Sequence, residues 1–289
     1  MRENFDDLGM LIVAILFGCA YSFQAIGAGY LSPFSFNIGK YVIATLTIFP
    51  LILRKTNTNL KKEIKYGLVI GILLFIFAYF AQVVADKENP GKIGFITTMY
   101  IVEVPVANLI FFKKKINLQT IISLIFALAG LALLCGVTDL SFKITDLYII
   151  ACSLLLCLEI IFIERYCKDC DAFKLNFFVC IFILIFSIIG CVITHEQPTL
   201  AAYKESAIPL LYVGLGCATI GCSLQNYCQK TLDATTCSLI MSLESVFSAI
   251  SGYLILNQTM SKIEIIGCVL MFIGVLLCIT SQKQKKSLR

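Results

Sequence analysis

The sequence predicts an all-α integral membrane protein with ten transmembrane helices, arranged as two inverted five-helix repeats. Of its 289 residues, 59% are hydrophobic and 14% are charged, whereas globular domains have about 45 to 50% apolar and about 25% charged residues. Its apolar stretches are about 20 residues long. This is the length that a helix needs to cross about 30 Å of hydrocarbon. The sequence lacks the short alternating segments of a membrane β-barrel.

Polar breaks divide the chain into ten expected spans. These cover residues 8–30, 33–53, 63–85, 91–112, 118–136, 144–164, 172–194, 206–228, 231–256 and 262–280. Pro33, Pro90 and Pro209 open spans, where the missing backbone N–H costs nothing. Pro105 lies in the middle of the fourth span and is the expected hinge, because a proline there removes one hydrogen bond of the helix.

Lysine and arginine residues predict the orientation of the spans. Seventeen of the 23 lie in segments on the side of the N-terminus, five lie on the opposite side, and Lys40 lies within a span. Because basic residues collect on the cytoplasmic side, we expect a multi-pass protein of the cytoplasmic membrane with both termini in the cytoplasm. The net charge of +5 follows from this bias and implies no nucleic-acid partner.

The two halves of the chain resemble each other. Asp7-Leu8 opens the first span as Asp146-Leu147 opens the sixth, and residues 129–135 parallel residues 273–278. The offset of about 140 to 144 residues separates a unit 1–138 from a unit 139–289. Because each unit has five spans, the second enters the membrane from the opposite side. Such inverted repeats are typical of secondary transporters, whose substrate site lies near the midplane between the halves.

Four ionisable residues lie at membrane depth: Lys40, Glu103, Glu159 and Glu244. A charge there costs roughly 2.5 to 3.5 kcal/mol, so these residues are the first candidates for substrate binding or coupling. Uncharged polar side chains at membrane depth must also find partners. The further candidates of this kind are Gln24, Tyr100, Gln225 and Asn226.

Glu244 lies about 12 residues into the ninth span, close to the membrane centre. Helical spacing places Cys237, Met241, Ser248 and Ser251 beside it. We expect a buried carboxylate that binds a proton or a substrate ammonium. The alternative is a structural glutamate bonded to a neighbouring helix.

Glu103 is also central, two residues before Pro105, with Tyr100 on roughly the same face. We expect it to line the translocation path, with an interhelical polar pair as the alternative.

Glu159 and Lys40 also have alternatives to a role in substrate binding or coupling. For Glu159 the alternative is an interfacial carboxylate that reaches Arg165 or lipid headgroups. For Lys40 it is a side chain that extends to the membrane surface.

Three stretches carry a resemblance to a known family. The clearest is SLIMSLESVFSAISGYL, at residues 238–254. The others are GCAYSFQAIGAGYLSPFSFNIGK, at residues 18–40, and GKIGFITTMYIVEVP, at residues 91–105. They are similar to corresponding runs in the EamA-type transporters of the drug/metabolite transporter superfamily. The resemblance implies ten helices, two inverted repeats and a central cavity open alternately to each side. The chain departs from the family at Lys40, Ser245, Asn257 and Glu103, where the family often has arginine, proline, a Gly-Glu pair and an apolar residue.

The expected function is secondary active transport of a small polar metabolite by alternating access, with the bilayer and protons as further partners. For an amino acid or related amine, Glu103 or Glu244 is expected to meet the ammonium and Lys40 the carboxylate; the resemblance favours export. Three carboxylates against one lysine leave open a cationic or nucleoside-type metabolite moved in the uptake direction. The sequence leaves a monomer and a homodimer both open.

An intramembrane enzyme is the alternative class, and the residues disfavour it. The only histidine, His195, lies in a loop, and no nucleophile–base pair or metal-ligand cluster can be assembled. The 14 cysteines follow no disulfide or zinc spacing, so we expect neither a metal nor a cofactor. No ATP-binding loop occurs in the sequence.

Overall fold

The computed structural model describes residues 2–85, 96–114, 116–135 and 144–287. Nine helices in this part of the chain are long and apolar enough to cross a membrane, and a further apolar helix, Tyr100–Phe112, is shorter. The span expected over residues 91–112 begins outside the described residues. No strand occurs in the described ranges. The predicted all-α membrane fold is confirmed.

The chain order of the helices follows the predicted spans. The first half, here called repeat 1, contains α1 (Arg2–Ala28), α2 (Pro33–Ile52), α3 (Leu60–Ala85), α5 (Tyr100–Phe112) and α6 (Leu118–Cys135). The second half, repeat 2, contains α7 (Ile144–Tyr166), α8 (Ala172–Ile193), α9 (Leu200–Glu205), α10 (Ala207–Leu211), the π-helix η1 (Tyr212–Gly221), α11 (Cys222–Cys228), α12 (Ala234–Met241), α13 (Glu244–Leu256) and α14 (Lys262–Ser287). Spans predicted to begin at residues 33, 118, 144, 172 and 262 do so.

Capping side chains explain two of the helix starts. The Asp171 carboxylate accepts hydrogen bonds from the backbone N–H groups of Phe173 and Lys174, both at 3.0 Å, at the start of α8. The Asp233 carboxylate accepts from the backbone N–H of Thr236 at 3.1 Å at the start of α12. These bonds satisfy N–H groups that have no partner within the first turn.

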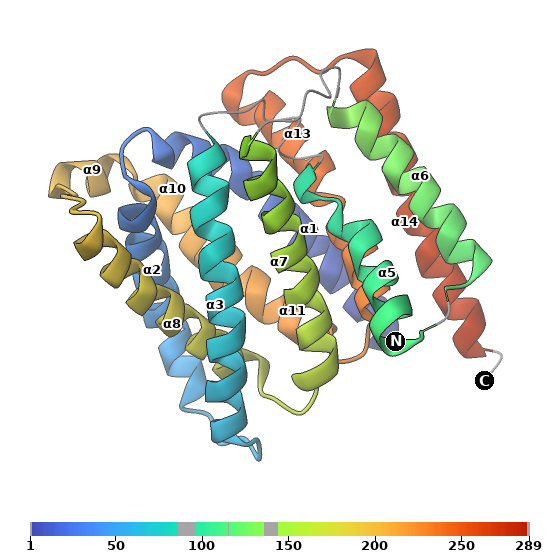
Figure 1. Cartoon of the computed structure of the whole chain (residues 1–289), viewed down its shortest axis with the longest axis horizontal. Helices are drawn as coiled ribbons and strands as arrows, with labels where there is room; N and C mark the ends of the chain where they lie inside the picture. The colour runs from blue at the N-terminus through green and yellow to red at the C-terminus, as the bar shows by residue number, and fades with distance from the viewer. Residues whose placement is uncertain (1, 86–95, 115, 136–143, 288–289) are drawn as a thin grey trace.

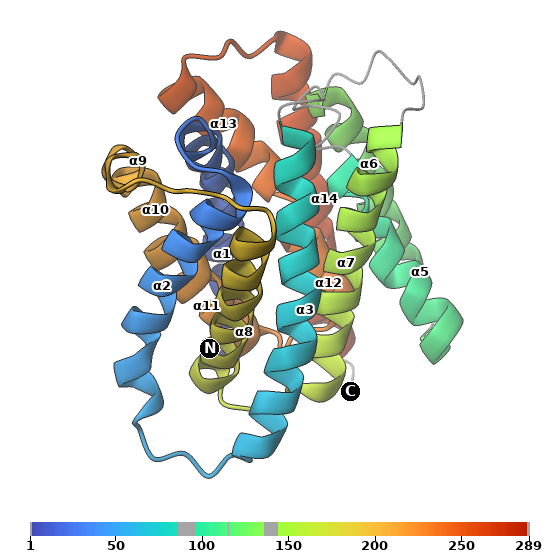
Figure 2. The same cartoon turned by 60° about the vertical axis from the view of Figure 1, so that its left-hand side comes forward.

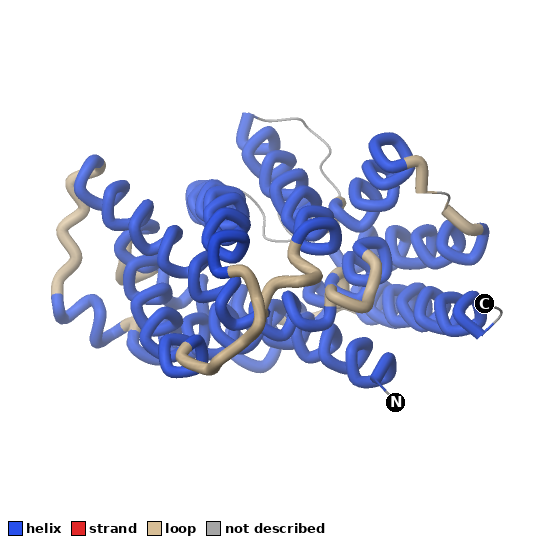
Figure 3. Tube along the Cα trace, turned by 90° about the horizontal axis from the view of Figure 1, so that it is seen from below, coloured by secondary structure: helices blue, strands red, loops and turns tan. Residues whose placement is uncertain are grey.

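The two repeats are interleaved. α1 contacts α13, α2 contacts α8, α3 contacts both α7 and α8, and α6 contacts α14, so every one of these contacts joins repeat 1 to repeat 2. α1 crosses the middle of the bundle (Figures 1 and 2). Both termini lie at the same end, here called the N/C face (Figure 1). Seen along the helices, the bundle is elongated, and α14 runs to the C-terminus at one edge (Figure 3).

Glycines bring α6 and α14 into backbone contact. A methyl group added to Gly130 would lie 2.6 Å from the carbonyl oxygen of Gly267, and one added to Gly274 would lie 2.8 Å from the carbonyl oxygen of Ser123. Both distances are too short for a real contact, so only glycine fits at either position without a shift of the backbone. Small residues of this kind allow membrane helices to pack closely.

The ninth span is not the single helix that the sequence predicts. α12 ends at Met241 and α13 begins at Glu244. Across the break, the N–H of Leu243 bonds to the carbonyl of Ile240 at 3.2 Å and that of Ser245 to the carbonyl of Ser242 at 3.2 Å. These bonds span three residues, the tighter pattern of a 3₁₀ turn. The predicted continuous helix is therefore interrupted between Met241 and Glu244.

The fourth span has the same break. The N–H of Met99 bonds to the carbonyl of Ile96, and that of Ile101 to the carbonyl of Thr98, both at 3.1 Å. α5 then begins at Tyr100, 144 residues before Glu244 at the start of α13.

The ends of these two half-helices also match. Lys113 after α5 and Asn257 after α13 both have φ of 53°, and their N–H groups bond to the carbonyls of Asn108 and Gly252. The backbone of the break is thus repeated in both halves of the chain.

The eighth span departs from the predicted α-helix as well. Its central ten residues, Tyr212–Gly221, form η1, a π-helix whose hydrogen bonds span five residues. The hydroxyl of Thr219 donates to the carbonyl of Gly214 at 2.9 Å, also five residues back. π-helical segments of this kind depend on tertiary contacts, and many lie at functional sites.

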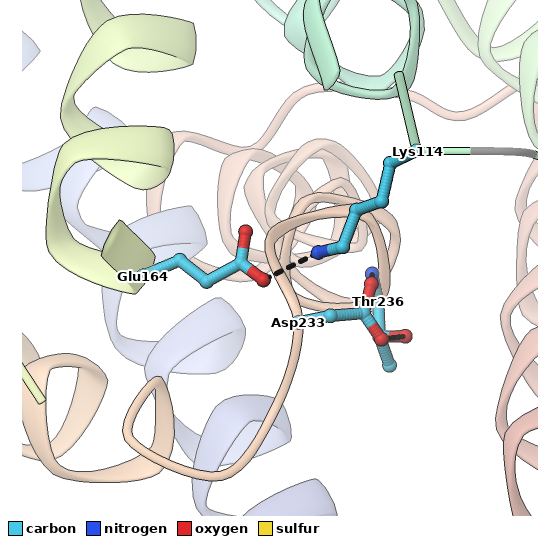
Figure 4. A network of polar contacts seen from close by, with 4 residues as sticks. All are labelled: Lys114, Glu164, Asp233 and Thr236. Atoms are coloured by element: carbon cyan, nitrogen blue, oxygen red, sulfur yellow. Dashed lines mark hydrogen bonds and ion pairs between the residues drawn. The ribbon is translucent and has the colours of Figure 1, made fainter. Parts of the chain in front are cut away.

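An ion pair joins the repeats near the N/C face (Figure 4). Lys114 Nζ, just after α5, lies 2.5 Å from Glu164 Oε1 near the end of α7. Asp233 and Thr236, bonded to each other at 2.9 Å, lie beside this pair. Because Lys114 is partly exposed, the pair contributes little to stability and mainly fixes the position of the chain after α5.

Candidate functional site

A cavity of about 140 Å³ lies between the two repeats. Its walls come from α1, α2 and α3 of repeat 1 and from α7, η1, α11, α12 and α13 of repeat 2. The residues that line it are Phe17, Ala20, Tyr21, Gln24, Phe36, Asn37, Lys40, Tyr41, Leu74, Phe77, Ala78, Ala81, Leu156, Glu159, Cys217, Ala218, Cys222, Gln225, Met241 and Glu244. Ligand sites are commonly cavities of this type, largely apolar with a few convergent polar groups.

Most of the polar residues singled out in the sequence meet in this cavity. Lys40, Glu159, Glu244, Gln24 and Gln225 all line it. Three other candidates, Glu103, Tyr100 and Asn226, are not among its lining residues. The structure thus gathers one ammonium and two carboxylates from separate helices around one space.

Glu244 lines the cavity as the first residue of α13. Its side chain is 4% exposed, and its Oε1 atom accepts a hydrogen bond of 3.0 Å from the hydroxyl of Tyr100, which is fully buried. The carboxylate lies at the N-terminal end of a half-helix, where the helix dipole favours negative charge. The predicted mid-membrane position is consistent with this burial, and the predicted alternative, a bond to a neighbouring helix, is also present.

Glu159 lies on α7 and is also 4% exposed. The side-chain amide of Gln225 donates to both of its carboxylate oxygens, at 3.1 and 3.2 Å. The alternative that Glu159 reaches Arg165 is wrong, because the guanidinium of Arg165 instead lies 3.8 Å from the ring centroid of Phe112. Gln225 therefore satisfies Glu159 without neutralising it.

Lys40 points into the protein and not to the membrane surface, so its alternative role as a surface-reaching side chain is wrong. Its ammonium lies 5.0 Å from the centroid of the Tyr41 ring, a favourable cation–π distance. Within the described ranges no carboxylate forms an ion pair with it. Its charge thus remains available to a ligand.

A carboxylate from repeat 2 holds the start of α2, the helix that carries Lys40. Glu196 accepts hydrogen bonds from the backbone N–H of Ser35 at 2.8 Å and from its hydroxyl at 2.6 Å. The N–H of Phe34 adds a third bond at 3.3 Å. No local pattern predicts this contact, because Glu196 lies in a loop 161 residues from Ser35.

The π-helix η1 supplies Cys217 and Ala218 to the cavity, and α11 continues the same wall with Cys222 and Gln225. The hydroxyl of Tyr212 and the thiol of Cys217 both donate to the carbonyl of Leu16 on α1, at 3.2 and 3.3 Å. These bonds tie η1 to the middle of α1. No sequence pattern indicated the π-helix.

Glu103 lies one turn into α5, half-buried, on the half-helix that packs against α7 and α12. Its Oε2 atom is buried and has no hydrogen-bond partner within the described residues. The expectation that it lines the path is not supported by the cavity described here. Its place in the span predicts depth in the membrane only, whereas the direction of the side chain depends on the rotation of α5 after the break.

Pro105 lies inside α5, several residues after the break. The corresponding break in repeat 2 forms with Ala249 at the matching position, so the break does not require a proline.

Asn226 is buried, with 6% of its surface exposed, on α11 next to Gln225. In the part of the chain that the structure describes, no group of three His, Cys, Asp or Glu side chains could hold a metal ion.

Comparisons with known proteins agree with this fold. Residues 4–136 and residues 143–280 each match the EamA-like transporter family. An "Uncharacterized transporter" of Archaeoglobus fulgidus is 26% identical over 277 residues, which cover 96% of this chain and 86% of that protein. A solved structure titled "Crystal structure of protein" covers 95% of this chain and 96% of its own, with a TM-score of 0.76. At 15% identity, that structure is evidence for the fold alone.

Proposed function

Because the chain belongs to the EamA-like transporter family and is a membrane transporter, we propose that it moves a small amine-bearing solute, such as an amino acid, through the cavity between its repeats. One observation carries the proposal. Lys40 of repeat 1 and Glu159 and Glu244 of repeat 2 line the same cavity without forming ion pairs with one another. Unpaired charges of both signs suit a ligand that itself carries both.

Each charge has a role in this proposal. Lys40 binds the carboxylate of the substrate, and Glu244 binds its ammonium. Gln24 and Asn37 offer further hydrogen bonds from the same space. The α3 wall is apolar throughout, with Leu74, Phe77, Ala78 and Ala81, and accommodates the apolar part of the substrate.

The charge balance favours proton coupling. With Lys40 against Glu159 and Glu244, the cavity has an excess of one negative charge when all three are ionised. A zwitterionic substrate has no net charge and leaves that excess unchanged. A proton bound to one of the two carboxylates brings the net charge of the cavity to zero. One elementary charge that crosses 100 mV yields about 2.3 kcal/mol, and one pH unit about 1.4 kcal/mol, which is enough for useful accumulation.

We further propose that the N/C face is cytoplasmic and that transport is export across the cytoplasmic membrane by alternating access. The support is the bias of basic residues, which favours both termini inside. The same excess of carboxylates supports a second candidate, a cationic or nucleoside-type metabolite moved in the uptake direction. In that case Lys40 repels the substrate and Glu159 shares its binding with Glu244.

Purified protein in liposomes tests both candidates. Counterflow and thermal stabilisation are measured with amino acids, polyamines and nucleosides, and the substrate found is then used with Glu244→Gln and Lys40→Gln. Glu103→Gln is the matched control, since Glu103 also lies in the first turn of a half-helix but does not line the cavity. We expect KM to rise at least about tenfold in the two cavity variants and less than about twofold in the control.

The outcomes separate the candidates. A zwitterionic substrate requires both Glu244 and Lys40, whereas a cation requires Glu244 and binds better in Lys40→Gln. Transport at the wild-type rate in both cavity variants would contradict the proposed site. Loss of transport only in Glu103→Gln would place the binding site outside this cavity.

A further inference from the structure

We propose that Tyr100 is a positioning residue, whose hydroxyl orients Glu244 toward the ammonium of the substrate and thereby connects substrate binding to both helix breaks. This inference rests on the proposed function, because it assigns Glu244 to the substrate amine. Tyr100 itself does not line the cavity. It acts through Glu244, which does.

The contact between these residues joins equivalent positions of the two repeats. Tyr100 is the first residue of α5 and Glu244 the first residue of α13, 144 residues apart. The Tyr100 hydroxyl donates to Glu244 Oε1 at 3.0 Å, and the two side chains are 0% and 4% exposed. Bulk water therefore does not compete for this bond, and a hydrogen bond to an ionised group is stronger than one between neutral groups.

A second contact links the same two breaks. The hydroxyls of Thr98 and Ser245 are 3.0 Å apart, and each residue lies within the 3₁₀ turn of its own break or directly after it. The half-helices α5 and α13 therefore meet where the α-helical hydrogen-bond pattern of each span is interrupted. Element ends of this kind are where helices absorb changes in backbone angle. A change at Glu244 is passed directly to both of these points.

The geometry leaves one side of the carboxylate for the substrate. Tyr100 takes Oε1, and within the described residues no hydrogen bond reaches Oε2. A phenol stabilises a carboxylate best when the carboxylate is ionised, because its O–H then donates to a full negative charge. Tyr100 thus holds Glu244 Oε1 and leaves Oε2 for the ammonium of the substrate.

Other titratable and charged groups surround Glu244 and form the background to this effect. They are Tyr21 of α1, Lys40 of α2 and Glu159 of α7, which line the same cavity. None of them donates a hydrogen bond to Glu244 within the described residues. Removal of the Tyr100 hydroxyl therefore changes the one direct partner and leaves this background in place.

The variant Tyr100→Phe tests the proposal, since it keeps the buried ring and removes only the hydroxyl. We expect KM for the amine substrate to rise about tenfold with kcat changed less than about threefold, and the pH of half-maximal transport to rise by about one unit. A fluorinated tyrosine at position 100 is a stronger donor and is expected to shift the same pH downward. It serves as the second variant if Tyr100→Phe folds poorly.

Ser22→Ala is the matched control. It removes another buried hydroxyl contact between the repeats, the 2.8 Å pair between Ser22 and Ser251, which does not involve Glu244. We expect its KM and pH profile to stay at wild-type values. Equal effects of Tyr100→Phe and Ser22→Ala would reduce the Tyr100 contact to packing and overturn the proposal.

Infrared spectroscopy separates this proposal from the proposed function. The carboxylic acid band of Glu244, identified by its loss in Glu244→Gln, is titrated in wild type and in Tyr100→Phe without substrate. A higher titration pH in Tyr100→Phe supports the positioning role even if no amine is transported. Amine transport with an unshifted band would overturn the role of Tyr100 and leave the proposed function standing.

Discussion

Two contacts join the repeats: that of α6 with α14 and that between the two helix breaks. They differ in whether the equivalent residues of the two repeats are identical. In the first, Gly130 and Gly274 are the same residue at the 144-residue spacing, and each faces the backbone of the other helix. In the second, the backbone is the same in both repeats, but Tyr100 corresponds to Glu244.

The difference shows which constraint acts at each place. Between α6 and α14, backbone lies against backbone in both repeats, and only glycine leaves enough room. At the breaks, the repeated hydrogen bonds involve main-chain atoms, so the side chains are free to diverge. This divergence places a carboxylate on α13 and none at the equivalent position of α5. These asymmetric positions therefore allow the protein to distinguish the two ends of a ligand.

The largest effect is expected when the asymmetric pair is exchanged. The double variant Tyr100→Glu, Glu244→Tyr keeps a phenol and a carboxylate between the breaks but moves the carboxylate to α5, where it does not line the cavity. We expect transport to be lost while the thermal midpoint stays above that of Tyr100→Glu alone, which places two carboxylates together. Transport by the exchanged pair would show that the two breaks are functionally equivalent.

Substitution of the symmetric glycines should affect both repeats equally. Gly130→Ala and Gly274→Ala each push a methyl group against backbone, so we expect each to destabilise the fold by about 1 to 3 kcal/mol. Thermal unfolding in detergent measures this. Gly216→Ala is the control, because its added methyl group would lie 3.6 Å from Leu16, an ordinary contact. Unequal losses at Gly130 and Gly274 would mean that this region has also diverged.

A smaller effect is expected at the ends of the half-helices. Lys113 and Asn257 both adopt φ of 53°, a conformation that asparagine tolerates better than lysine. We expect Lys113→Gly to stabilise the fold by about 1 kcal/mol and Asn257→Lys to destabilise it by a similar amount. Thermal midpoints of the two variants check the pair. A loss of stability in Lys113→Gly would show that a contact of the lysine side chain stabilises the fold by more than the positive φ destabilises it.

The smallest effect is expected for Pro105→Ala. Because the break in repeat 2 forms with Ala249 at the matching position, we expect the break in repeat 1 to persist without its proline. Transport should stay within about twofold of wild type, and stability within about 0.5 kcal/mol. A large loss of transport would instead restore Pro105 as the hinge that the sequence suggested.

Hydropathy and charge predicted the fold well because they report depth in the membrane. The spans beginning at Pro33 and Lys262 were found from these signals alone, and the carboxylates that they placed within spans, Glu159 and Glu244, are buried. Depth does not give rotation about a helix axis, which is set by packing against neighbouring helices. Glu103 and Glu244 have similar depths, and only the structure shows that one lines the cavity and the other does not.

The interruptions of the helices were missed for a related reason. The turn at Ser242 and Leu243 contains no glycine or proline, and a bond such as that from Tyr100 to Glu244 links residues 144 apart. The π-helix is supported by bonds from Tyr212 and Cys217 to Leu16 on another helix. Such long-range contacts leave no periodic pattern in the local sequence.

The π-helix η1 has a consequence for how such a protein can evolve. A π turn holds one residue more than an α turn, so it absorbs an inserted residue without rotating the helix that follows it. Loss of a single codon within Tyr212–Gly221 would therefore return one turn to the α form and leave Cys222 and Gln225 on the cavity wall. Cys217 and Ala218, inside the π-helix, would be repositioned by the same deletion. A one-residue insertion or deletion here thus changes a small part of the ligand-facing surface and keeps the rest of the span in place.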